Sequence, residues 1–524
     1  MRRFFAAAVL LMSLCACTRA MQAGIGERHA WTIPHVVRFA DIADPDRLNP
    51  YLSTMDISYD LSSLIYSYLV ISDGHGRLIG DLATTVPTLA NGGISADGRT
   101  YTYHLRHGVQ WHDGRRFTAQ DVIASWRAVV DPRNNTLHRE GFDRIAAIDA
   151  PDPYTVVVHL KQPYAPLVSQ FFAPLQEGGK PVLPAHILQR QADFNTGTLA
   201  THPIGTGPFE FVSWQRGDRI ELKRFDKYFK GVPKLERIEY RILPNDNTML
   251  NETEAHRIDL VVAPPQAQIE SYRGISGVTT EFAPWNAQVI LIFNARKAAL
   301  HDPNVRRAIA YALDKESMIS KISHGVGQPA YNSLPPTAIG YEPLKPYAFD
   351  AKRSAELLHG RHISFTLATI AVGATLETLA LAMQSELHDV GIDMSIKTYP
   401  YNTIFAIDGP IYRGSYDAAM YSTTLNWDPN VLDYLGCNQW YPKGENVFGY
   451  CNPKLDQLEE SGLATIDPVK RAAIYRDASR IIWDDLPYFP LYQYRRTIVR
   501  NSDLKNYSVN PTSTPWWNAW QWDI

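Results

Sequence analysis

The sequence predicts an α/β protein built from more than one domain. Short segments rich in β-branched residues alternate along the chain with amphipathic segments of helical period, without a visible internal repeat. A helix followed by a strand across a short joint is typical of α/β architecture. The chain has 524 residues, and a single hydrophobic core stops growing beyond about 250–300 residues. We therefore expect several domains.

Several segments have the pattern of β-strands. They alternate apolar and polar residues or are continuously apolar, and they are enriched in β-branched residues. The clearest are 155–160 (TVVVHL), 219–222, 237–243 and 288–294 (QVILIFN).

Three helices are predicted to begin at an Asp-Pro or Asn-Pro pair, at Asp302, Asn452 and Asp467. The first side chain of each pair caps the helix, and the missing N–H of the proline costs nothing at the first helical position. After Asp302, residues 305, 308, 309, 312 and 313 form a buried stripe. A further helix is expected over 376–387, closed by Gly391 ahead of a strand at 392–398.

The first residues have the order of a secretory leader: a positive start, a short apolar run over 4–12, then small residues. The run is shorter than the roughly 20 residues of a membrane-spanning helix, and no later segment is long and apolar enough. Leu14 and Ala16 before Cys17 resemble a lipoprotein processing site. We predict a signal peptide over 1–16, lipidation at Cys17, a lipidated tether over 17–33, and a location in the cell envelope outside the cytoplasmic membrane. A cleaved signal without lipid is the alternative.

The composition indicates a soluble globular body. Hydrophobic residues make up 45% and charged residues 20% of the chain. The formal charge of −3 becomes about −5 once the two arginines of the leader are removed. This argues against nucleic-acid binding, which requires a basic face. Because nucleotides and most cofactors are absent outside the cytoplasmic membrane, we expect no cofactor.

Two of the four cysteines belong to the leader, which leaves Cys437 and Cys451. Oxidising conditions outside the cell favour a disulfide between them. The chain-entropy model gives such a loop roughly 3 kcal/mol of stabilisation. Two free thiols or a metal pair are the alternatives, and no third or fourth ligand stands nearby at metal-site spacing.

Several further blocks stand out: 101–122 (YTYHLRHGVQWHDGRRFTAQDV), 205–209 (GTGPF) with Trp214, 291–294 (LIFN), 305–314 (VRRAIAYALD), 325–330, 334–336 (LPP), 449–454 (GYCNPK) and 485–491 (DLPYFPL). In this order they resemble the family 5 extracellular solute-binding proteins, the dipeptide, oligopeptide and nickel receptors of ABC importers. The similarity covers nearly all of residues 34–524.

The resemblance implies a two-lobed periplasmic-binding-protein fold (type II, cluster C) with an extra inserted subdomain and a hinge-closed cleft. Lobe I would be discontinuous, over 34–60, 196–283 and 492–524. The inserted subdomain would occupy 61–195 and lobe II 284–491. Ligand would lie between the two lobes.

The resemblance also places candidate ligand contacts in residues 421–429. In the family's peptide receptors this stretch carries an acidic residue that pairs with the ligand's α-amino group. Alignment on Asp428 and Pro429 puts Leu425 where dipeptide receptors often have that aspartate. Either Asp428 serves, or the protein does not bind a free α-amine; Asp428 can also be a turn residue that caps a helix. The other candidates here are Tyr421, Asn426 and Trp427.

Family position suggests further contacts. Tyr51 lies in a loop that reaches the cleft in relatives, or in a plain surface turn. Trp285 and Asn286 precede a strand from which an extended peptide can be paired, or Trp285 is a core residue. Arg413 can bind a ligand carboxylate bidentately or pair with Asp417.

Three nearby histidines, His104, His107 and His112, do not predict a metal site. They follow a strand–turn segment, in which period-two alternation does not bring all three together. We expect no metal.

We therefore expect a monomeric receptor that captures peptides and delivers them to an ABC permease in the membrane. Alternatives are a receptor for a nickel complex, an oligosaccharide or a glutathione-like solute, a receptor that signals without import, and an exported hydrolase. The sequence has no Gly-x-Ser-x-Gly elbow, no His-Glu-x-x-His helix and no Cys–His arrangement with a free thiol. We expect no enzymatic activity and no catalytic residues.

Overall fold

A computed structural model describes residues 28–137, 139, 141–174, 179–188, 194–323, 325–370, 373–425 and 427–524. The predicted signal peptide, the predicted lipidation site at Cys17 and the candidate ligand contact Asn426 lie outside the described residues. Within these ranges, none of the helices combines the length and apolarity that crossing a membrane requires.

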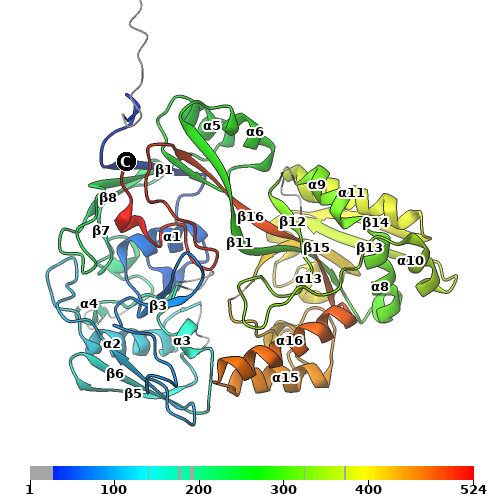
Figure 1. The fold of residues 1–524 in the computed structure, drawn as a ribbon, viewed down its shortest axis with the longest axis horizontal. Helices are drawn as coiled ribbons and strands as arrows, with labels where there is room; N and C mark the ends of the chain where they lie inside the picture. Colours follow the sequence, from blue (N-terminus) through cyan, green and yellow to red (C-terminus); the bar gives the residue numbers. More distant parts are fainter. Residues whose placement is uncertain are drawn as a thin grey trace, which may run out of the picture.

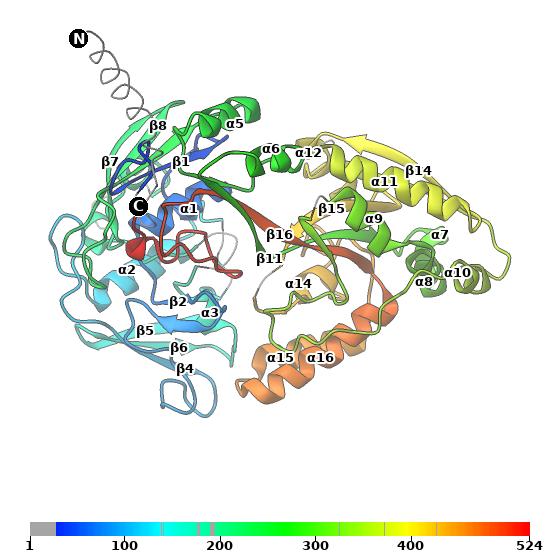
Figure 2. The same cartoon turned by 45° about the horizontal axis from the view of Figure 1, so that its top comes forward.

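Two long antiparallel strands, β11 (Val278–Phe293) and β16 (Tyr488–Asn501), run through the middle of the molecule and belong to both of its lobes (Figure 1). Among the described residues they are central in an eleven-stranded sheet of order β14-β13-β15-β11-β16-β10-β1-β9-β8-β7, with β12 (Gly327–Pro329) also paired to β16. We call the half that contains β1, β7 and β8 lobe I and the half that contains β14 and β15 lobe II (Figure 2). The residue boundaries drawn from the sequence stay a prediction.

Lobe I is built around β1, which lies parallel between β9 and β10. The predicted strands at 219–222 and 237–243 correspond to β8 and β9 and are confirmed. Its elements are β1 (Val36–Asp41), β7 (Phe209–Gln215), β8 (Arg219–Arg224), β9 (Arg237–Ile242), β10 (Leu260–Val262), α1 (Asp56–Ile65), α5 (Asp246–Glu254), α6 (Ile269–Arg273), η1 (Pro50–Leu52), η2 (Thr198–Ala200), η3 (Gln266–Gln268) and η4 (Ala519–Gln521).

The segment between α1 and η2 adds two small sheets, β2–β3 and β4-β6-β5, beneath lobe I (Figure 1). One buried hydrophobic cluster continues from Val37 and Leu61 of lobe I through Tyr101 and Val158 to Trp522 near the C-terminus. This segment therefore shares its core with lobe I. Its elements are β2 (Val70–Ser72), β3 (Leu78–Gly80), β4 (Thr100–His104), β5 (Ile145–Asp152), β6 (Thr155–Leu160), α2 (Ala119–Val130), α3 (Leu167–Gln170) and α4 (Ala185–Leu188).

Lobe II has a hydrophobic cluster of its own, centred on β11, β13 and β15. Strands β13 and β14 are parallel and are connected by α11. The helix predicted over 376–387 corresponds to α11 and the strand predicted over 392–398 to β14, and both are confirmed. Its elements are β13 (Ile363–Ile370), β14 (Ile392–Tyr399), β15 (Ala418–Thr424), α7 (Ala298–His301), α8 (Pro303–Ala312), α9 (Lys315–Ile322), α10 (Ala351–Leu358), α11 (Gly373–His388), α12 (Tyr401–Ile404), α13 (Pro410–Arg413), α14 (Leu432–Leu435), α15 (Pro453–Ala464) and α16 (Pro468–Asp485).

The three predicted helix starts are confirmed at α8, α15 and α16. In each, the side chain of Asp302, Asn452 or Asp467 accepts a hydrogen bond from the backbone N–H two residues later, at 2.8, 3.0 and 2.9 Å respectively. Proline occupies the first turn in all three helices. These starts are local interactions, which explains why they could be predicted from adjacent residues.

The GTGPF block is pressed against the end of α1. A Cβ atom added to Gly205 would lie 1.8 Å from the carbonyl oxygen of Ile65, so only glycine fits there. His112 holds the same turn: its Nδ1 accepts from the N–H of Gly205 at 3.2 Å, and its Nε2 lies 3.1 Å from the carbonyl oxygen of Gly207. Burial lowers the pKa of His112 to about 4. This neutral imidazole has a structural role.

Arg306, in the VRRAIAYALD block, is 2% exposed and also has a structural role. Its guanidinium donates to the carbonyl oxygens of Leu300 at 2.7 Å, His301 at 2.8 Å and Asp485 at 2.6 Å. These bonds satisfy backbone groups at the ends of α7 and α16. Two of the family-like blocks therefore meet each other in the core of lobe II.

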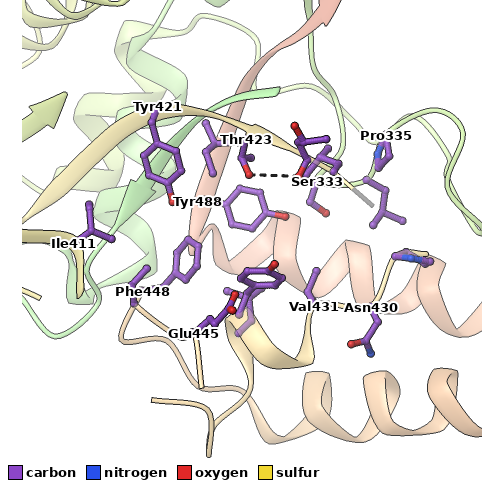
Figure 3. Close-up of a pocket in the computed structure, with 18 of the residues that line it drawn as sticks. Ser333, Pro335, Ile411, Tyr421, Thr423, Asn430, Val431, Glu445, Phe448 and Tyr488 are labelled. Carbon is purple, nitrogen blue, oxygen red and sulfur yellow. Dashed lines mark hydrogen bonds between the residues drawn. The ribbon is translucent and has the colours of Figure 1, made fainter. Parts of the chain in front are cut away.

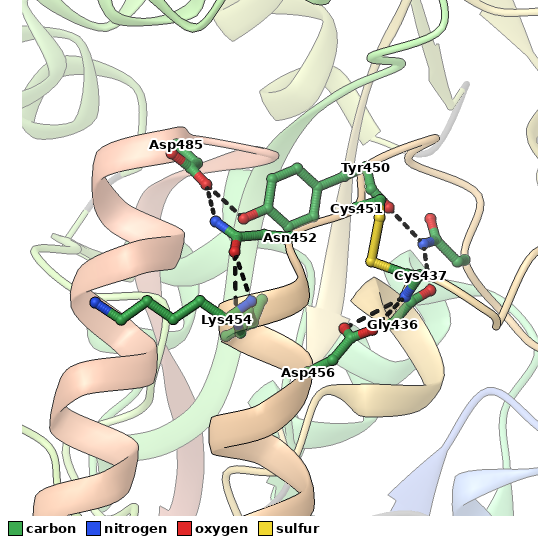
Figure 4. Close-up of a disulfide and its surroundings, with 10 residues drawn as sticks. Gly436, Cys437, Tyr450, Cys451, Asn452, Lys454, Asp456 and Asp485 are labelled. Carbon is green, nitrogen blue, oxygen red and sulfur yellow. Dashed lines mark hydrogen bonds between the residues drawn. A yellow bond between two sulfur atoms is a disulfide. The ribbon is translucent and has the colours of Figure 1, made fainter.

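Cys437 and Cys451 form a disulfide, as predicted (Figure 4). Around it, the carboxylate of Asp456 accepts from the N–H of Cys437 at 3.1 Å. The carboxylate of Asp485 accepts from Tyr450 at 2.6 Å and from Asn452 at 2.9 Å. The loop closed by the disulfide is thus tied to both α15 and α16.

Candidate ligand-binding site

A cavity of about 680 Å³ lies between the lobes, where β11 and β16 cross from one to the other. Lobe I contributes Asp41, Ile42, Asp246, Met249 and 262–267, the crossing strands contribute Trp285, Ala287 and 494–497, and lobe II contributes Lys321, Ile322, Val326, Ile370, Thr375, Leu376, Thr378 and 422–424. Its volume is within the range of small-molecule sites, about 300–1,000 Å³. We call it the interlobe cavity.

The floor of the interlobe cavity coincides with an irregularity in the crossing strands. The register of β11 and β16 shifts between Pro284 and Gln288, and Trp285 lies inside this interruption. The guanidinium carbon of Arg496 lies 4.7 Å from the centre of a Trp285 ring, and Gln493 donates to the carbonyl oxygen of Trp285. A broken ladder between two lobes is a natural place for hinge bending.

Charged groups of both signs border this cavity. Asp41 and Asp246 line it from lobe I, and Arg495 and Arg496 line it from β16. Burial raises the pKa of Asp41, and burial raises the pKa of the nearby Asp60 to about 7, although the charge of Arg496 opposes that rise. The interlobe cavity is therefore lined by both carboxyl and guanidinium groups.

Strand β15 presents an open edge to the interlobe cavity. All of 418–424 pairs with β11, but β13 pairs only with 418–420. Among the described strands, the remaining 421–424 has no partner on that side, and Ser422, Thr423 and Thr424 line the cavity. An exposed strand edge is a template for main-chain hydrogen bonds.

A second cavity, of about 230 Å³, lies wholly within lobe II (Figure 3). Thr423 and Thr424 line both cavities, so the two adjoin at the end of β15. We call it the lobe II cavity. Its lining is Ile290, Ser333, Leu334, Pro335, Phe405, Ile411, Tyr412, Tyr421, Thr423, Thr424, Leu425, Asp428, Pro429, Asn430, Val431, Tyr434, Leu435, Glu445, Val447, Phe448 and Tyr488.

Aromatic rings form much of the wall of the lobe II cavity. Phe405 and Tyr421 meet edge to face with centroids 5.1 Å apart. Phe448 and Tyr488 lie 5.8 Å apart. Phe448 belongs to the loop that the disulfide closes. This loop therefore forms part of the cavity wall, together with the strand residues Tyr421 and Tyr488.

Asp428 is at the edge of the lobe II cavity but is already paired. It is 5% exposed, and its carboxylate lies 2.7 Å from the guanidinium of Arg471, which is 4% exposed. Arg471 also donates to the carbonyl oxygen of Gly462 at 2.8 Å. A ligand amine would have to compete with this buried ion pair for Asp428.

Glu459 lies behind the same wall. Its carboxylate accepts from the side chain of Asn430 at 3.0 Å and from the N–H of Val431 at 3.1 Å. Burial raises the pKa of Glu459 to about 8, an effect that the charge of Asp428 reinforces and that the Val431 hydrogen bond opposes.

The structure brings some of the predicted contacts together. Trp285 lines the interlobe cavity, and Tyr421 and Asp428 line the lobe II cavity. Asn286 is 1% exposed. Its backbone carbonyl oxygen accepts a hydrogen bond from the backbone N–H of Leu425 at 2.6 Å. Trp427 is half-buried and lines neither cavity.

Tyr51 and Arg413 line neither cavity. Tyr51 is 2% exposed and donates to the carbonyl oxygen of Pro181 at 2.6 Å, so the surface-turn interpretation is wrong. The pairing of Arg413 with Asp417 is also wrong, because Arg413 lies 3.8 Å from Asp408 while Asp417 lies 3.5 Å from Lys297. Their roles in ligand binding stay predictions.

The sequence analysis did not identify most of the residues that line the two cavities. Arg496 had no motif that singled it out, and Phe405 stands outside every family-like block, whereas 422–424 lies inside the predicted contact stretch 421–429. Tyr488 lies inside the DLPYFPL block, which was a usable signal.

In the described ranges, no group of three His, Cys, Asp or Glu side chains could hold a metal ion.

The sequence model of the bacterial extracellular solute-binding proteins, family 5, matches residues 82–442. The probable D,D-dipeptide-binding periplasmic protein DdpA of Escherichia coli (strain K12) is 27% identical over 499 residues, covering 92% of this chain and 93% of that protein. The oligopeptide-binding protein AppA of Bacillus subtilis (strain 168) is 25% identical over 507 residues, with coverages of 91% and 90%.

Solved structures have the same fold. The ABC transporter-associated periplasmic binding protein DppA from Helicobacter pylori, in complex with the peptide STSA, has a TM-score of 0.74 and 26% identity, covering 93% of this chain and 98% of that one. The ABC transporter substrate-binding protein CtaP from Listeria monocytogenes has a TM-score of 0.83, 23% identity and the same coverages. With a matching model over more than half of its length, this chain belongs to the bacterial extracellular solute-binding proteins, family 5.

Proposed function

We propose that this protein captures a peptide in the interlobe cavity and delivers it to the permease of an ABC transporter. The observation that carries the proposal is the edge of β15 at 421–424, which no described strand pairs on the β13 side and which borders a cavity lined by both lobes. Relatives named for D,D-dipeptides and oligopeptides, and a similar structure holding a tetrapeptide, support the same ligand class.

The main chain of the peptide extends along 421–424 and completes the sheet as an added strand. Such pairing supplies affinity through backbone hydrogen bonds and tolerates different side chains. Bending at the β11–β16 irregularity then closes lobe I over the ligand. Closure is favoured only to the extent that the ligand contacts both lobes better in the closed form.

The termini of the peptide meet the charged residues of the interlobe cavity. Leu425 offers no charge, and Asp428 is paired with Arg471. Asp41 and Asp246 are therefore the partners we propose for the α-amino group, and Arg495 or Arg496 for the carboxylate. Trp285 contacts the ligand from the cavity floor, and Asp428 shapes the wall beside it.

The remaining expectations belong to the same proposal. The chain is a monomer in the cell envelope, held by a lipid on Cys17, and it binds its ligand without transforming it. The composition and the leader support the location.

The test uses the chain from residue 18 onward, purified, with any co-purified small molecule released and identified by mass spectrometry. Thermal unfolding is then followed with peptides of two to five residues. A peptide at 100 times its Kd raises the free energy of unfolding by about 2.7 kcal/mol. N-methylated versions of a binding peptide should bind more weakly, because they lack main-chain donors. A released sugar or nickel complex, with no response to any peptide, would overturn the proposal.

A further inference from the structure

We propose that the lobe II cavity receives one large apolar side chain of the bound peptide, preferably an aromatic one, and rejects acidic side chains. This inference rests on the proposed peptide-binding function and adds a ligand preference to it.

Size and position indicate that the lobe II cavity holds part of a ligand. Its volume of about 230 Å³ is below the range of about 300–1,000 Å³ typical of sites that enclose a whole small molecule. It adjoins the interlobe cavity at Thr423 and Thr424, which line both cavities. A peptide extended along β15 therefore has room for one side chain that branches into lobe II.

The lining selects the chemistry of that side chain. Phe405, Tyr421, Phe448 and Tyr488 contribute aromatic rings to the lining, which also includes aliphatic side chains. Offset and edge-to-face contacts between rings stabilise beyond area burial alone. An aromatic side chain that enters from the peptide would find such partners.

Charge excludes acidic side chains. No Lys, Arg or His is among the residues that line this cavity in the described part of the chain. Its carboxylates are Glu445 and Asp428, and the counter-ion Arg471 is already paired with Asp428. An Asp or Glu side chain of a ligand would lose its hydration beside the carboxylate of Glu445 and the Asp428–Arg471 pair, without gaining a positive partner among the lining residues.

The cavity wall is braced before ligand arrives. Glu445, Val447 and Phe448 lie in the loop between Cys437 and Cys451. Inside that loop, the side-chain amide of Asn446 donates to the carbonyl oxygens of Gly436 at 3.0 Å and Tyr450 at 2.9 Å. A wall held in place reduces the ordering cost of binding.

The experiment measures calorimetric affinities for tetra-alanine and for analogues with a single Phe or a single Glu at each position. We expect one position at which Phe binds at least about tenfold more tightly than Ala, since burying a large apolar side chain contributes about 1.5–3 kcal/mol. Glu at that position should bind more weakly than Ala. At that position the Phe analogue should also bind with a more negative heat-capacity change, because it buries more apolar surface.

Two matched variants test whether the preference for Phe arises in the lobe II cavity. Val431→Trp fills the lobe II cavity from its wall, whereas Val469→Trp makes the same change at a site on α16 that is 76% exposed and lines neither cavity. We expect Val431→Trp to reduce the Phe-to-Ala ratio to near one while tetra-alanine still binds, and Val469→Trp to leave the ratio unchanged.

The outcomes separate the two proposals. If alanine peptides bind but Phe gives no gain, or Glu binds as well as Phe, the inference is wrong and the proposed function stands. A preference that survives in Val431→Trp would also contradict the inference. If no peptide binds at all, the proposed function fails and the inference fails with it. Should Val431→Trp not fold, the heat-capacity comparison on the unaltered protein decides.

Discussion

Lobe I and lobe II both line the interlobe cavity, but they contribute different kinds of groups to it. Lobe I presents carboxylates from β1 and α5 and shares one hydrophobic core with the segment inserted after α1. Lobe II presents the open edge of β15 and contains a cavity of its own, walled by rings and a disulfide-closed loop. Under the proposed function these features divide the tasks: lobe I supplies the carboxylates of the interlobe cavity, β16 supplies guanidinium groups, and lobe II supplies main-chain pairing and side-chain selection.

The largest expected effect tests whether the Asp428–Arg471 pair supports the lobe II cavity. Arg471→Met leaves Asp428 buried without its partner, so the free energy of unfolding should fall by about 3–5 kcal/mol. Urea unfolding measures it. The control Arg480→Met removes an exposed arginine from the same helix, where ion pairs contribute about 0–1 kcal/mol.

A complementary substitution separates stability from ligand binding. Asp428→Asn should lower stability with little direct effect on peptide affinity. A loss of about 2 kcal/mol or more in affinity, at unchanged stability, would instead assign Asp428 to the ligand.

The next effect concerns the core that lobe I shares with its insertion. In Gly205→Ala the new Cβ would meet the carbonyl oxygen of Ile65 at 1.8 Å, and we expect a loss of about 3 kcal/mol. Gly274→Ala is the matched control, since its Cβ would have no neighbour closer than 3.4 Å and its φ is negative. Equal melting temperatures for the two variants would contradict the close packing of this turn.

Removal of the disulfide should have a smaller effect, confined to lobe II. The double variant Cys437→Ser with Cys451→Ser should lose about 2–3 kcal/mol and weaken the preference for an aromatic peptide. Binding of tetra-alanine should change little, because the edge of β15 is outside the loop. If tetra-alanine loses as much affinity as the Phe analogue, the two lobe II functions are not separate.

The smallest expected effect is a change in pH dependence. Burial raises the pKa of Glu459 from its ordinary 4.5 to about 8, so between these values the folded chain holds a proton that the unfolded chain has released. This contribution to stability is complete below pH 4.5 and is lost as the pH rises to about 8. Glu459→Gln removes the titrating group, and with it this pH-dependent contribution to stability. The variant should therefore gain stability relative to the original protein between pH 5 and pH 8; a constant difference across this range would contradict the raised pKa.

The sequence by itself determined the features that depend on neighbouring residues. The caps at Asp302, Asn452 and Asp467, the helix over 376–387 with the strand after it, and the disulfide all follow from short-range pattern or from compartment, and all are present. The family also followed from blocks whose order could be read directly along the chain.

Only the tertiary structure decided which side chains face a ligand. Asp428 meets Arg471 from 43 positions away, and that pairing, not the adjacent Pro429, decides what its carboxylate can do. Tyr51 entered the lobe I core and Arg413 stayed at the surface, although both occupied plausible family positions. The two cavities are made from segments that are distant in sequence. Their walls depend on how strands and helices pack together, which propensity and spacing within one segment do not specify.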